Sequence, residues 1–223
     1  MAALESLLMF LGSSVCHQIA ERSYFLGDVQ MPLCARCIGI HFGFLLSSSF
    51  LILGFGRSAL RLPSLRQMIP LAAIMAFYFV DVGLSYSGIS TSDNLRRTLS
   101  GLAAGIPLPF IIVPLLSTVL RGSEGETSPL GSPSKWALFA AFYVLAALAI
   151  LTVDRNGILF YAVSIAGVIG VFVFFVVMVS TLVVVGLERK EVPGARKLVL
   201  GLTLAMFIVL ALATTHQVLG PGA

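Results

Sequence analysis

Six long runs of apolar residues, separated by short polar connectors, dominate the chain. These runs span residues 33–55, 69–89, 95–120, 135–153, 157–187 and 198–218. Each has the length of about 20 mostly apolar residues that a transmembrane helix needs. Lipid cannot satisfy exposed backbone polar groups, and the runs lack the alternation of barrel strands, so each run must be a helix. The pattern predicts an all-α, polytopic membrane helix bundle.

A shorter apolar stretch, residues 2–15, precedes the six runs. It is too short to cross a bilayer comfortably and carries Glu5, with no basic residue ahead of it, so it does not have the pattern of a secretory signal. We expect a short interfacial or re-entrant helix packed on the bundle. The composition fits a membrane protein, because 11% of the residues are charged, against roughly a quarter in soluble proteins.

The longest connector, residues 121–135, is rich in Gly, Ser and Pro and has balanced charge, which is typical of a flexible linker. We therefore divide the chain into an N-terminal part at 1–120, a cytoplasmic linker at 121–134 and a C-terminal part at 135–223. The first part holds the Cys/His stretch and three spans, and the last part holds the other three. All belong to one membrane domain.

The basic residues indicate how the bundle lies in the membrane. Nine fall on one side of the six crossings: Arg57, Arg61, Arg66, Arg121, Lys135, Arg189, Lys190, Arg196 and Lys197. Five fall on the other: Arg22, Arg36, Arg96, Arg97 and Arg155. The excess of Lys and Arg in cytoplasmic loops places the first side in the cytoplasm and the cysteines on the extracytoplasmic face. This bias accounts for the net charge of +4, so the lipid bilayer is the predicted partner and nucleic acid is not; protein partners stay unknown.

All three cysteines and two of the three histidines lie within residues 13–43. Cys34, Cys37 and His41 are spaced i, i+3 and i+7 after Pro32, which fits the first turn of a helix, so one helical face carries all three. A connector of 16 residues is long enough to fold the preceding Cys16 back onto that face.

Thiolates and imidazoles are the ligands that zinc and other borderline or soft metals prefer. The predicted ligands are Cys16, His17, Cys34, Cys37 and His41. Zinc is the expected ion, with copper, nickel and iron as alternatives. A site with four protein ligands would be closed and structural, so a structural and a functional metal are both consistent with the sequence.

Two other interpretations of the cysteines stay open. A helix N-terminus and the adjacent Arg36 would lower the pKa of Cys34 and favour attack on a disulfide, with Cys37 resolving the product, as in a membrane thiol-disulfide oxidoreductase. Alternatively, the cysteines pack, or fasten the N-terminal segment to the bundle, without any catalysis.

A second polar group surrounds Asp81, which lies inside the run 69–89, about 12 Å from its outer end. Ionisable residues at such depth usually face the bundle interior and pair, and Arg96 and Arg97 open the next run within reach. A purely structural ion pair, or a hydrogen bond from Ser85 or Tyr86, is the simpler interpretation.

In the functional interpretation, Asp81 and Arg97 are catalytic residues of an intramembrane enzyme or transporter for a lipid or small anion. Arg22 and Arg97 would bind a negative headgroup while Asp81 relays protons. The absence of a nucleotide-binding motif argues against ATP-driven transport, and the sequence leaves open whether the protein is an enzyme. Gly101 and Gly105 form a G-x-x-x-G pair, which allows helices to approach closely.

Three stretches, CHQIAERSYF at 16–25, PLCARCIGIHFG at 32–43 and DNLRRTLSGLAAG at 93–105, resemble a family of small bacterial and archaeal membrane proteins of unknown function. Its pattern runs C-H, R-S, P-x-C-x-R-C-x-G-I with a further Gly, an intramembrane Asp, and N-x-x-R-x-x-[ST]-G-x-x-x-G. In this chain it falls on Cys16, His17, Arg22, Ser23, Pro32, Cys34, Arg36, Cys37, Gly39, Ile40, Gly43, Asp81, Asn94, Arg97, Ser100, Gly101 and Gly105.

The resemblance covers about the first half of the chain and implies that these polar residues act together. We expect Arg22, Arg36 and Asn94 to surround the bound metal or cofactor. The resemblance implies no particular reaction.

Overall fold

The computed structural model describes residues 2–55, 60–121, 125–186 and 194–219. The helices are α1 (Ala2–Gly12), η1 (Ala20–Arg22), α2 (Ala35–Phe55), α3 (Leu65–Tyr86), α4 (Asn94–Gly105), α5 (Leu108–Arg121), α6 (Pro133–Leu151), η2 (Val153–Arg155), α7 (Gly157–Gly186) and α8 (Gly194–Leu219). Two short strands, β1 (Phe25–Leu26) and β2 (Val29–Gln30), form an antiparallel hairpin. Within these described ranges, six helical segments, with α4 and α5 taken as one, are long and apolar enough to cross a membrane. The predicted all-α bundle and its short N-terminal helix are confirmed.

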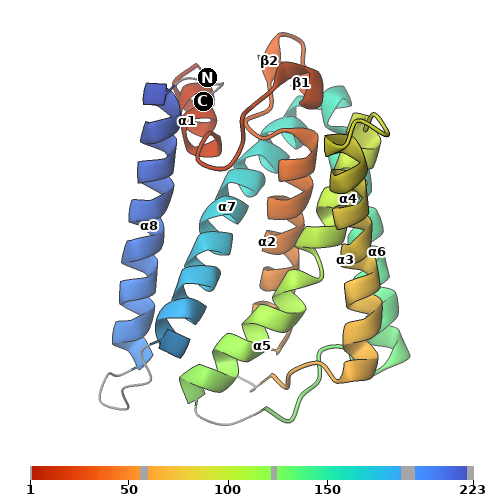
Figure 1. Ribbon diagram of the computed structural model, residues 1–223, viewed down its shortest axis with the longest axis vertical. Helices are drawn as coiled ribbons and strands as arrows, with labels where there is room; N and C mark the ends of the chain where they lie inside the picture. The colour runs from red at the N-terminus through yellow and green to blue at the C-terminus, as the bar shows by residue number, and fades with distance from the viewer. Residues whose placement is uncertain (1, 56–59, 122–124, 187–193, 220–223) are drawn as a thin grey trace.

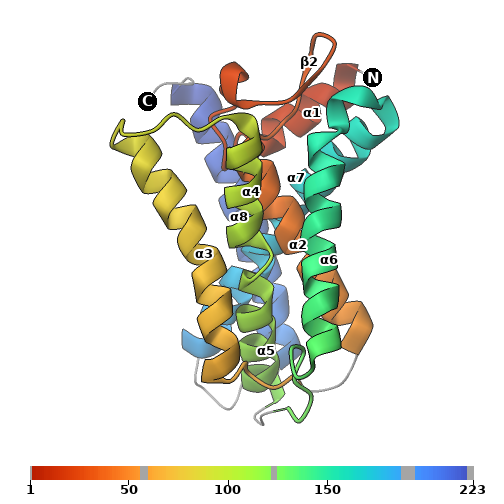
Figure 2. The ribbon, with the colours of Figure 1, turned by 90° about the vertical axis from the view of Figure 1, so that its right-hand side faces the viewer.

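Helix α2 lies at the centre of the bundle and contacts α4, α5, α6 and α7 (Figure 1). Helix α8 packs along α7, and α3 packs on α4. Figure 2 shows that α3 leans away from α4 toward the end of the bundle where the hairpin lies.

Glycines allow a close contact between α2 and α4. A Cβ atom added at Gly101 would overlap the carbonyl oxygen of Arg36, and one added at Gly105 would overlap that of Ile40. On the other helix, a Cβ at Gly39 would lie 2.7 Å from the carbonyl oxygen of Thr98. The prediction that the G-x-x-x-G pair supports close helix approach is confirmed.

Two predicted boundaries need correction. The run 95–120 is not a continuous helix, because α4 ends at Gly105 and α5 begins at Leu108. Pro107 lies in this break, and proline has no N–H to donate to the preceding helical turn. The run 69–89 ends as a helix at Tyr86, shortly before Gly88, which takes the left-handed φ of +72° that glycine adopts at helix ends.

One end of the bundle gathers the polar segments. Residues 13–34, including the hairpin, lie there together with the end of α3 and the start of α4, as Figure 1 shows. The sequence placed these segments on one side of the membrane, and the fold agrees, although which side faces outward stays a prediction. Of the nine basic residues assigned to the cytoplasm, Arg57, Arg189 and Lys190 lie outside the described residues, and the side chains of Arg121, Arg196 and Lys197 also fall outside the description.

The division into residues 1–120, 121–134 and 135–223 stays a prediction. Residues 122–124 of the linker lie outside the described residues. In the described part, α5 and α6 both contact α2, so the two halves share one central helix.

Candidate functional site

The three cysteines meet at the end of α2. Cys16 follows α1, Cys34 directly precedes α2, and Cys37 lies in the first turn of α2. Their sulfur atoms all lie within 4.8 Å of one another. Cys16 is buried and the other two are partly buried, and all three are free thiols. We call these residues the cysteine trio.

Two glutamine side chains fold the connector so that Cys16 reaches α2. Gln18 donates through Nε2 to the carbonyl oxygens of Met9 at 2.7 Å and of Pro32 at 2.9 Å, which ties the end of α1 to the residues before Cys34. Gln30 donates in turn to the carbonyl of Gln18 at 2.7 Å. Gln18 has a φ of +52°, a left-handed conformation that costs a non-glycine residue about 1–3 kcal/mol. This strain is located two residues from Cys16.

Backbone N–H groups surround the sulfur atoms. The N–H groups of Gln18 and Cys34 donate to Sγ of Cys16, at 3.4 Å and 3.2 Å. Hydrogen bonds from the Cys16 and Cys37 thiols, and then from the backbone of Cys37 and Arg36, lower the pKa of Cys34. The hydrogen bond to Cys34, followed by burial, raises the pKa of Cys16. The trio therefore stabilises one thiolate, at Cys34, before any metal binds.

The two histidines predicted as ligands lie outside the group of atoms within 4.8 Å. His17 is exposed, and its ring faces that of His216 with the centroids 6.0 Å apart. His41 is buried one helical turn beyond Cys37, where its ring packs edge-on against Phe174 at 5.4 Å. The structure thus brings together three of the five predicted metal ligands.

Asp81 is the centre of a second polar cluster. The carboxylate is buried and pairs with Arg36, and with Nε of Arg96 at 2.6 Å. Ser92 donates to it at 3.1 Å and Ser100 at 2.8 Å. Pairing of Asp81 with Arg96 is as the sequence predicted. Among the described residues, these two arginines and two serines are the partners of the carboxylate, as the structural interpretation expects. A proton-relay role of Asp81 stays a prediction.

Several predicted partners of Asp81 have other contacts. Arg97 makes no ion pair among the described residues, and its Nη1 lies 3.5 Å from Oδ1 of Asn94. The hydroxyl of Ser85 donates to the backbone carbonyl of Asp81 at 2.7 Å rather than to the carboxylate. Tyr86 is exposed.

The sequence did not reveal the pair of Arg36 with Asp81, although it singled out both residues. Arg36 stands between two cysteines, which suggested a role beside the metal. The sequence holds one weak signal for the cluster around Asp81. Ser100 lies four residues after Arg96, so the two side chains share one face of the helix. Arg36 lies at the start of α2, between Cys34 and Cys37 in the sequence, and pairs with Asp81. It therefore links the cysteine trio to the cluster around Asp81.

Asn94 joins the connector between α1 and α2 to the start of α4. Its Nδ2 donates to the carbonyl of Ser23 at 3.1 Å, and the hydroxyl of Tyr24 donates to its carbonyl at 3.2 Å. Tyr24 also lies 2.8 Å from the Thr98 hydroxyl. Arg22, at the end of η1, is exposed. A direct role of Asn94 or Arg22 in cofactor binding stays a prediction.

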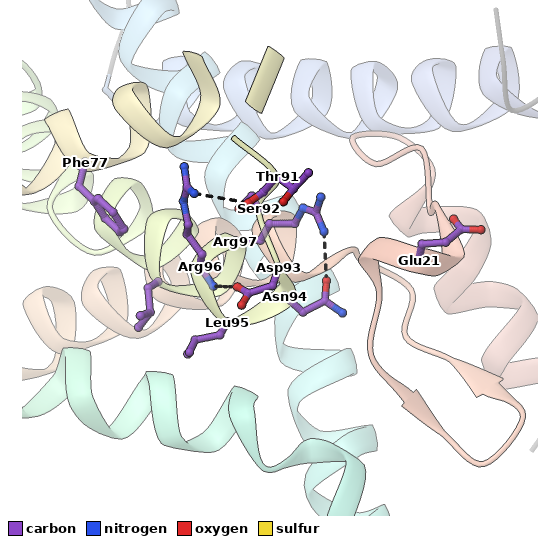
Figure 3. Close-up of a pocket in the computed structure, with 10 residues that line it drawn as sticks. Glu21, Phe77, Thr91, Ser92, Asp93, Asn94, Leu95, Arg96 and Arg97 are labelled. Carbon is purple, nitrogen blue, oxygen red and sulfur yellow. Dashed lines mark hydrogen bonds between the residues drawn. The ribbon is translucent and has the colours of Figure 1, made fainter. Parts of the chain in front are cut away.

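A cavity of about 760 Å³ opens at the start of α4 (Figure 3). Its lining residues are Glu21, Phe77, Thr91, Ser92, Asp93, Asn94, Leu95, Arg96, Arg97 and Leu99. We call it the arginine cavity. Arg96 is fixed by Asp81 and by a hydrogen bond to Ser90 at 2.6 Å. Among the described residues, the guanidinium of Arg97 has only the long hydrogen bond to Asn94.

Comparisons with known proteins place the chain among membrane proteins without an assigned function. Residues 16–111 match a family described as "Predicted membrane protein (DUF2085)", and this segment contains the cysteine trio and Asp81. No solved structure is significantly similar to the chain.

Two archaeal relatives are similar to the same half of the chain. An uncharacterized protein of Methanocaldococcus jannaschii is 32% identical over 105 residues, covering 46% of this chain and 64% of the relative. Another, of Methanothermobacter thermautotrophicus, is 32% identical over 111 residues, covering 48% of this chain and 92% of the relative. The chain belongs to this family of predicted membrane proteins, whose function is unknown.

Proposed function

We propose that the protein is a metal-binding membrane protein in which Cys16, Cys34 and Cys37 hold a zinc-like ion at one end of the bundle. The observation that supports this proposal most directly is that the three sulfur atoms lie within 4.8 Å of one another. In tetrahedral zinc sites with Zn–S bonds of about 2.3 Å, the sulfurs are about 3.8 Å apart. The sulfur atoms would need to move about 1 Å closer together to reach the spacing of such a site.

The surroundings of the trio support this proposal. Hydrogen bonds lower the pKa of Cys34 and so favour its thiolate, which is the form that binds metal. The two N–H groups that donate to Sγ of Cys16 would also favour negative charge on that sulfur once a metal displaces its proton. Three thiolates around a divalent ion carry a net charge of −1. Cys34 interacts electrostatically with the Arg97 guanidinium, which has no carboxylate partner among the described residues, so a positive charge is available to balance the site.

Three protein ligands leave a fourth position, which catalytic zinc sites keep for water or substrate and structural sites fill with a side chain. His17 is the first candidate for that position, since it is exposed and follows Cys16 directly. His41 is second, because its ring is already packed against Phe174. Copper, nickel and iron are alternative ions for a thiolate-rich site.

Removal of the metal tests the proposal. A ligand that binds only the folded protein stabilises it, so a strong zinc chelator should lower the melting temperature of the detergent-purified protein. Zinc added in excess should restore it. Cys37→Ser should lower the starting melting temperature and make the protein insensitive to chelator, whereas an unchanged response in Cys37→Ser would reject the site. His17→Ala should weaken zinc binding if His17 is the fourth ligand.

Thiol-disulfide exchange is the second candidate, and the position of Cys34 supports it. Cys34 directly precedes α2, and its lowered pKa favours the thiolate. The thiolate would attack a disulfide of a partner protein, forming a mixed disulfide and releasing the partner's other sulfur as a thiolate. Cys37 would then attack Cys34, leaving a Cys34–Cys37 disulfide and a reduced partner. In Cys37→Ala the mixed disulfide should accumulate, and its absence would eliminate exchange.

A further inference from the structure

An apolar groove of about 540 Å³ opens between two of the membrane-spanning helices, α3 and α6. Figure 2 shows these helices on opposite sides of α4, and Ala103 of α4, which is 1% exposed, lies at the floor of the groove. On α3 the lining begins at Pro70 and ends at Phe77, near the middle of the helix. On α6 it begins at Trp136, in the first turn. The groove therefore runs from the middle of the bundle toward the starts of α3 and α6, the end opposite the cysteine trio.

The lining favours a hydrocarbon chain whose polar part lies at the Trp136 end. Only two polar groups belong to the lining side chains, the hydroxyl of Tyr143 and the indole N–H of Trp136. Tyr143 donates its proton to the carbonyl of Leu99 at 2.8 Å. The indole N–H makes no hydrogen bond with a described residue, so it is available to a ligand. Tryptophan side chains prefer the membrane interface, where the ring contacts hydrocarbon and the N–H reaches polar groups.

The depth of the groove matches one leaflet of a bilayer. Arg66 lies one turn before Pro70 and shares a face of α3 with Pro70 and Phe77. From Arg66 to Phe77 the helix rises about 17 Å. One leaflet contributes about 15 Å of the hydrocarbon core. An acyl chain that starts beside Arg66 would therefore reach the middle of the bilayer at Phe77.

The two walls of the groove are attached to the same connector at its open end. Gln67 of α3 donates through Nε2 to the hydroxyl of Ser128 at 3.1 Å and to the carbonyl of Leu130 at 2.9 Å. Lys135 of α6 donates through Nζ to the carbonyl of Ser128 at 2.7 Å. The spacing of α3 and α6 at this end is thus fixed before a ligand binds, which lowers the cost of binding.

The charges beside the open end favour an anionic headgroup. Around the starts of α3 and α6, the described part of the chain holds the basic residues Arg61, Arg66 and Lys135 and one acidic residue, Glu126. Lys135 is engaged by Ser128 and by the ring of Phe55, whose centroid lies 5.2 Å from Nζ. Arg66 is exposed, and its guanidinium has neither an ion pair nor a hydrogen bond with a described residue. It is therefore the cation available to a phosphate.

We propose that the groove binds one acyl chain of an anionic phospholipid, with the phosphate at Arg66 and the headgroup at the starts of α3 and α6. The distribution of basic residues predicts that this end faces the cytoplasm, so the lipid comes from the cytoplasmic leaflet, whose surface is negatively charged. The site lies at the opposite end of the bundle from the cysteine trio and does not depend on a bound metal.

Lipid binding to the full chain in detergent, measured by native mass spectrometry, tests this proposal. The probes are dioleoyl phosphatidylglycerol, dioleoyl phosphatidylethanolamine and inorganic phosphate. The wild type should bind phosphatidylglycerol about fivefold more tightly than the zwitterionic phosphatidylethanolamine, the factor expected of one basic group near a charged headgroup. Arg66→Ala should weaken phosphatidylglycerol about fivefold and remove most of this preference. Inorganic phosphate should not bind measurably, because the acyl chain supplies most of the buried area.

Matched variants separate a specific site from general lipid contact. Ala140→Phe fills the groove and should weaken both lipids, whereas Ala141→Phe changes an exposed residue outside the lining and should leave binding unchanged. Arg155→Ala removes an exposed basic residue at the opposite end of the bundle and should bind like the wild type. Arg66 is exposed, so its replacement tests the site without disturbing the core.

Three results would overturn the proposal. These are equal binding of the two lipids by the wild type, binding of inorganic phosphate at the affinity of phosphatidylglycerol, and equal binding by Arg66→Ala and Arg155→Ala. Zinc content, measured on the same samples, should not change in Arg66→Ala, so failure here would leave the metal site untouched.

Discussion

At the scale of single residues, Asp81 stabilises the polar end of the bundle. It is 1% exposed and lies where three helices meet: Arg36 contributes from α2, Arg96 from α4, and Asp81 itself from α3. A buried carboxylate with two arginine partners and two hydroxyl donors has its hydrogen-bonding capacity filled. It therefore holds α3 against the other two helices at the end where α3 leans away.

Replacing this carboxylate should destabilise the protein. Asp81→Asn removes the negative charge and leaves two guanidinium groups facing each other, and breaking a buried pair costs about 3–5 kcal/mol. Because the side chain of Arg96 is 30% exposed and can turn to solvent, we expect a loss near the lower limit. Thermal unfolding in detergent measures it. Asp154→Asn, an exposed residue of η2, is the control and should melt like the wild type.

Residue types and spacing predicted the cysteine cluster but not all its geometry. Cys34 and Cys37 are one turn apart on the same chain segment, so their proximity follows from local structure. Cys16 reaches them through hydrogen bonds of Gln18 and Gln30, which no spacing rule indicates. His41 has suitable spacing, yet packing against Phe174 determines where its ring lies.

At the scale of elements, glycine-mediated contact between α2 and α4 positions both polar clusters. Helix α2 carries Cys37 and Arg36, and α4 carries Arg96, Arg97 and Ser100. A wider separation of these helices would pull Arg36 away from the groups that share Asp81. The small residues are therefore needed for the site as well as for packing.

Enlarging one glycine at this contact should destabilise the bundle. In Gly101→Ala the new methyl group overlaps the carbonyl oxygen of Arg36, and overpacking typically costs about 1–3 kcal/mol. Gly83→Ala is the matched control, because it lies in α3 with no atom within 4 Å of the added Cβ. That change should be neutral or stabilising by up to about 1 kcal/mol, through helix propensity. Equal melting temperatures for the two variants would contradict the close contact.

Length and hydropathy predicted the spanning helices well, since a run of about 20 apolar residues has few alternatives in lipid. Length and hydropathy did not predict the break between α4 and α5. This break depends on Pro107, which lacks one backbone N–H but leaves the run apolar. The hairpin of β1 and β2 was also missed, because its strands have two residues each. Such short pairing depends on the bundle beneath it.

At the scale of the whole molecule, the polar segments gather at one end. The cysteine trio, the Asp81 cluster and the arginine cavity lie there, while Arg61, Arg66 and Lys135 lie at or near the starts of α3 and α6, at the other end (Figure 2). The distribution of basic residues predicts that the polar end faces out of the cell. Metal ions outside the cell would then reach the cysteine trio from that side.

Labelling with a membrane-impermeant maleimide tests this orientation. Asp154→Cys adds an exposed thiol at the polar end, and Glu126→Cys adds one in the connector at the opposite end. Intact cells should label Asp154→Cys above the background of the parent protein. Glu126→Cys should gain label only after lysis, and the reverse pattern would invert the topology.

The metal content of the purified protein tests the central claim most directly. Inductively coupled plasma mass spectrometry should be applied to protein prepared without a metal-affinity step, beside a variant that combines Cys34→Ser and Cys37→Ser. We predict about one zinc-like ion per chain in the parent and a large loss in the variant, because the trio supplies the thiolate ligands. Equal metal content in the two samples, or none in either, would contradict a metal site built from Cys16, Cys34 and Cys37.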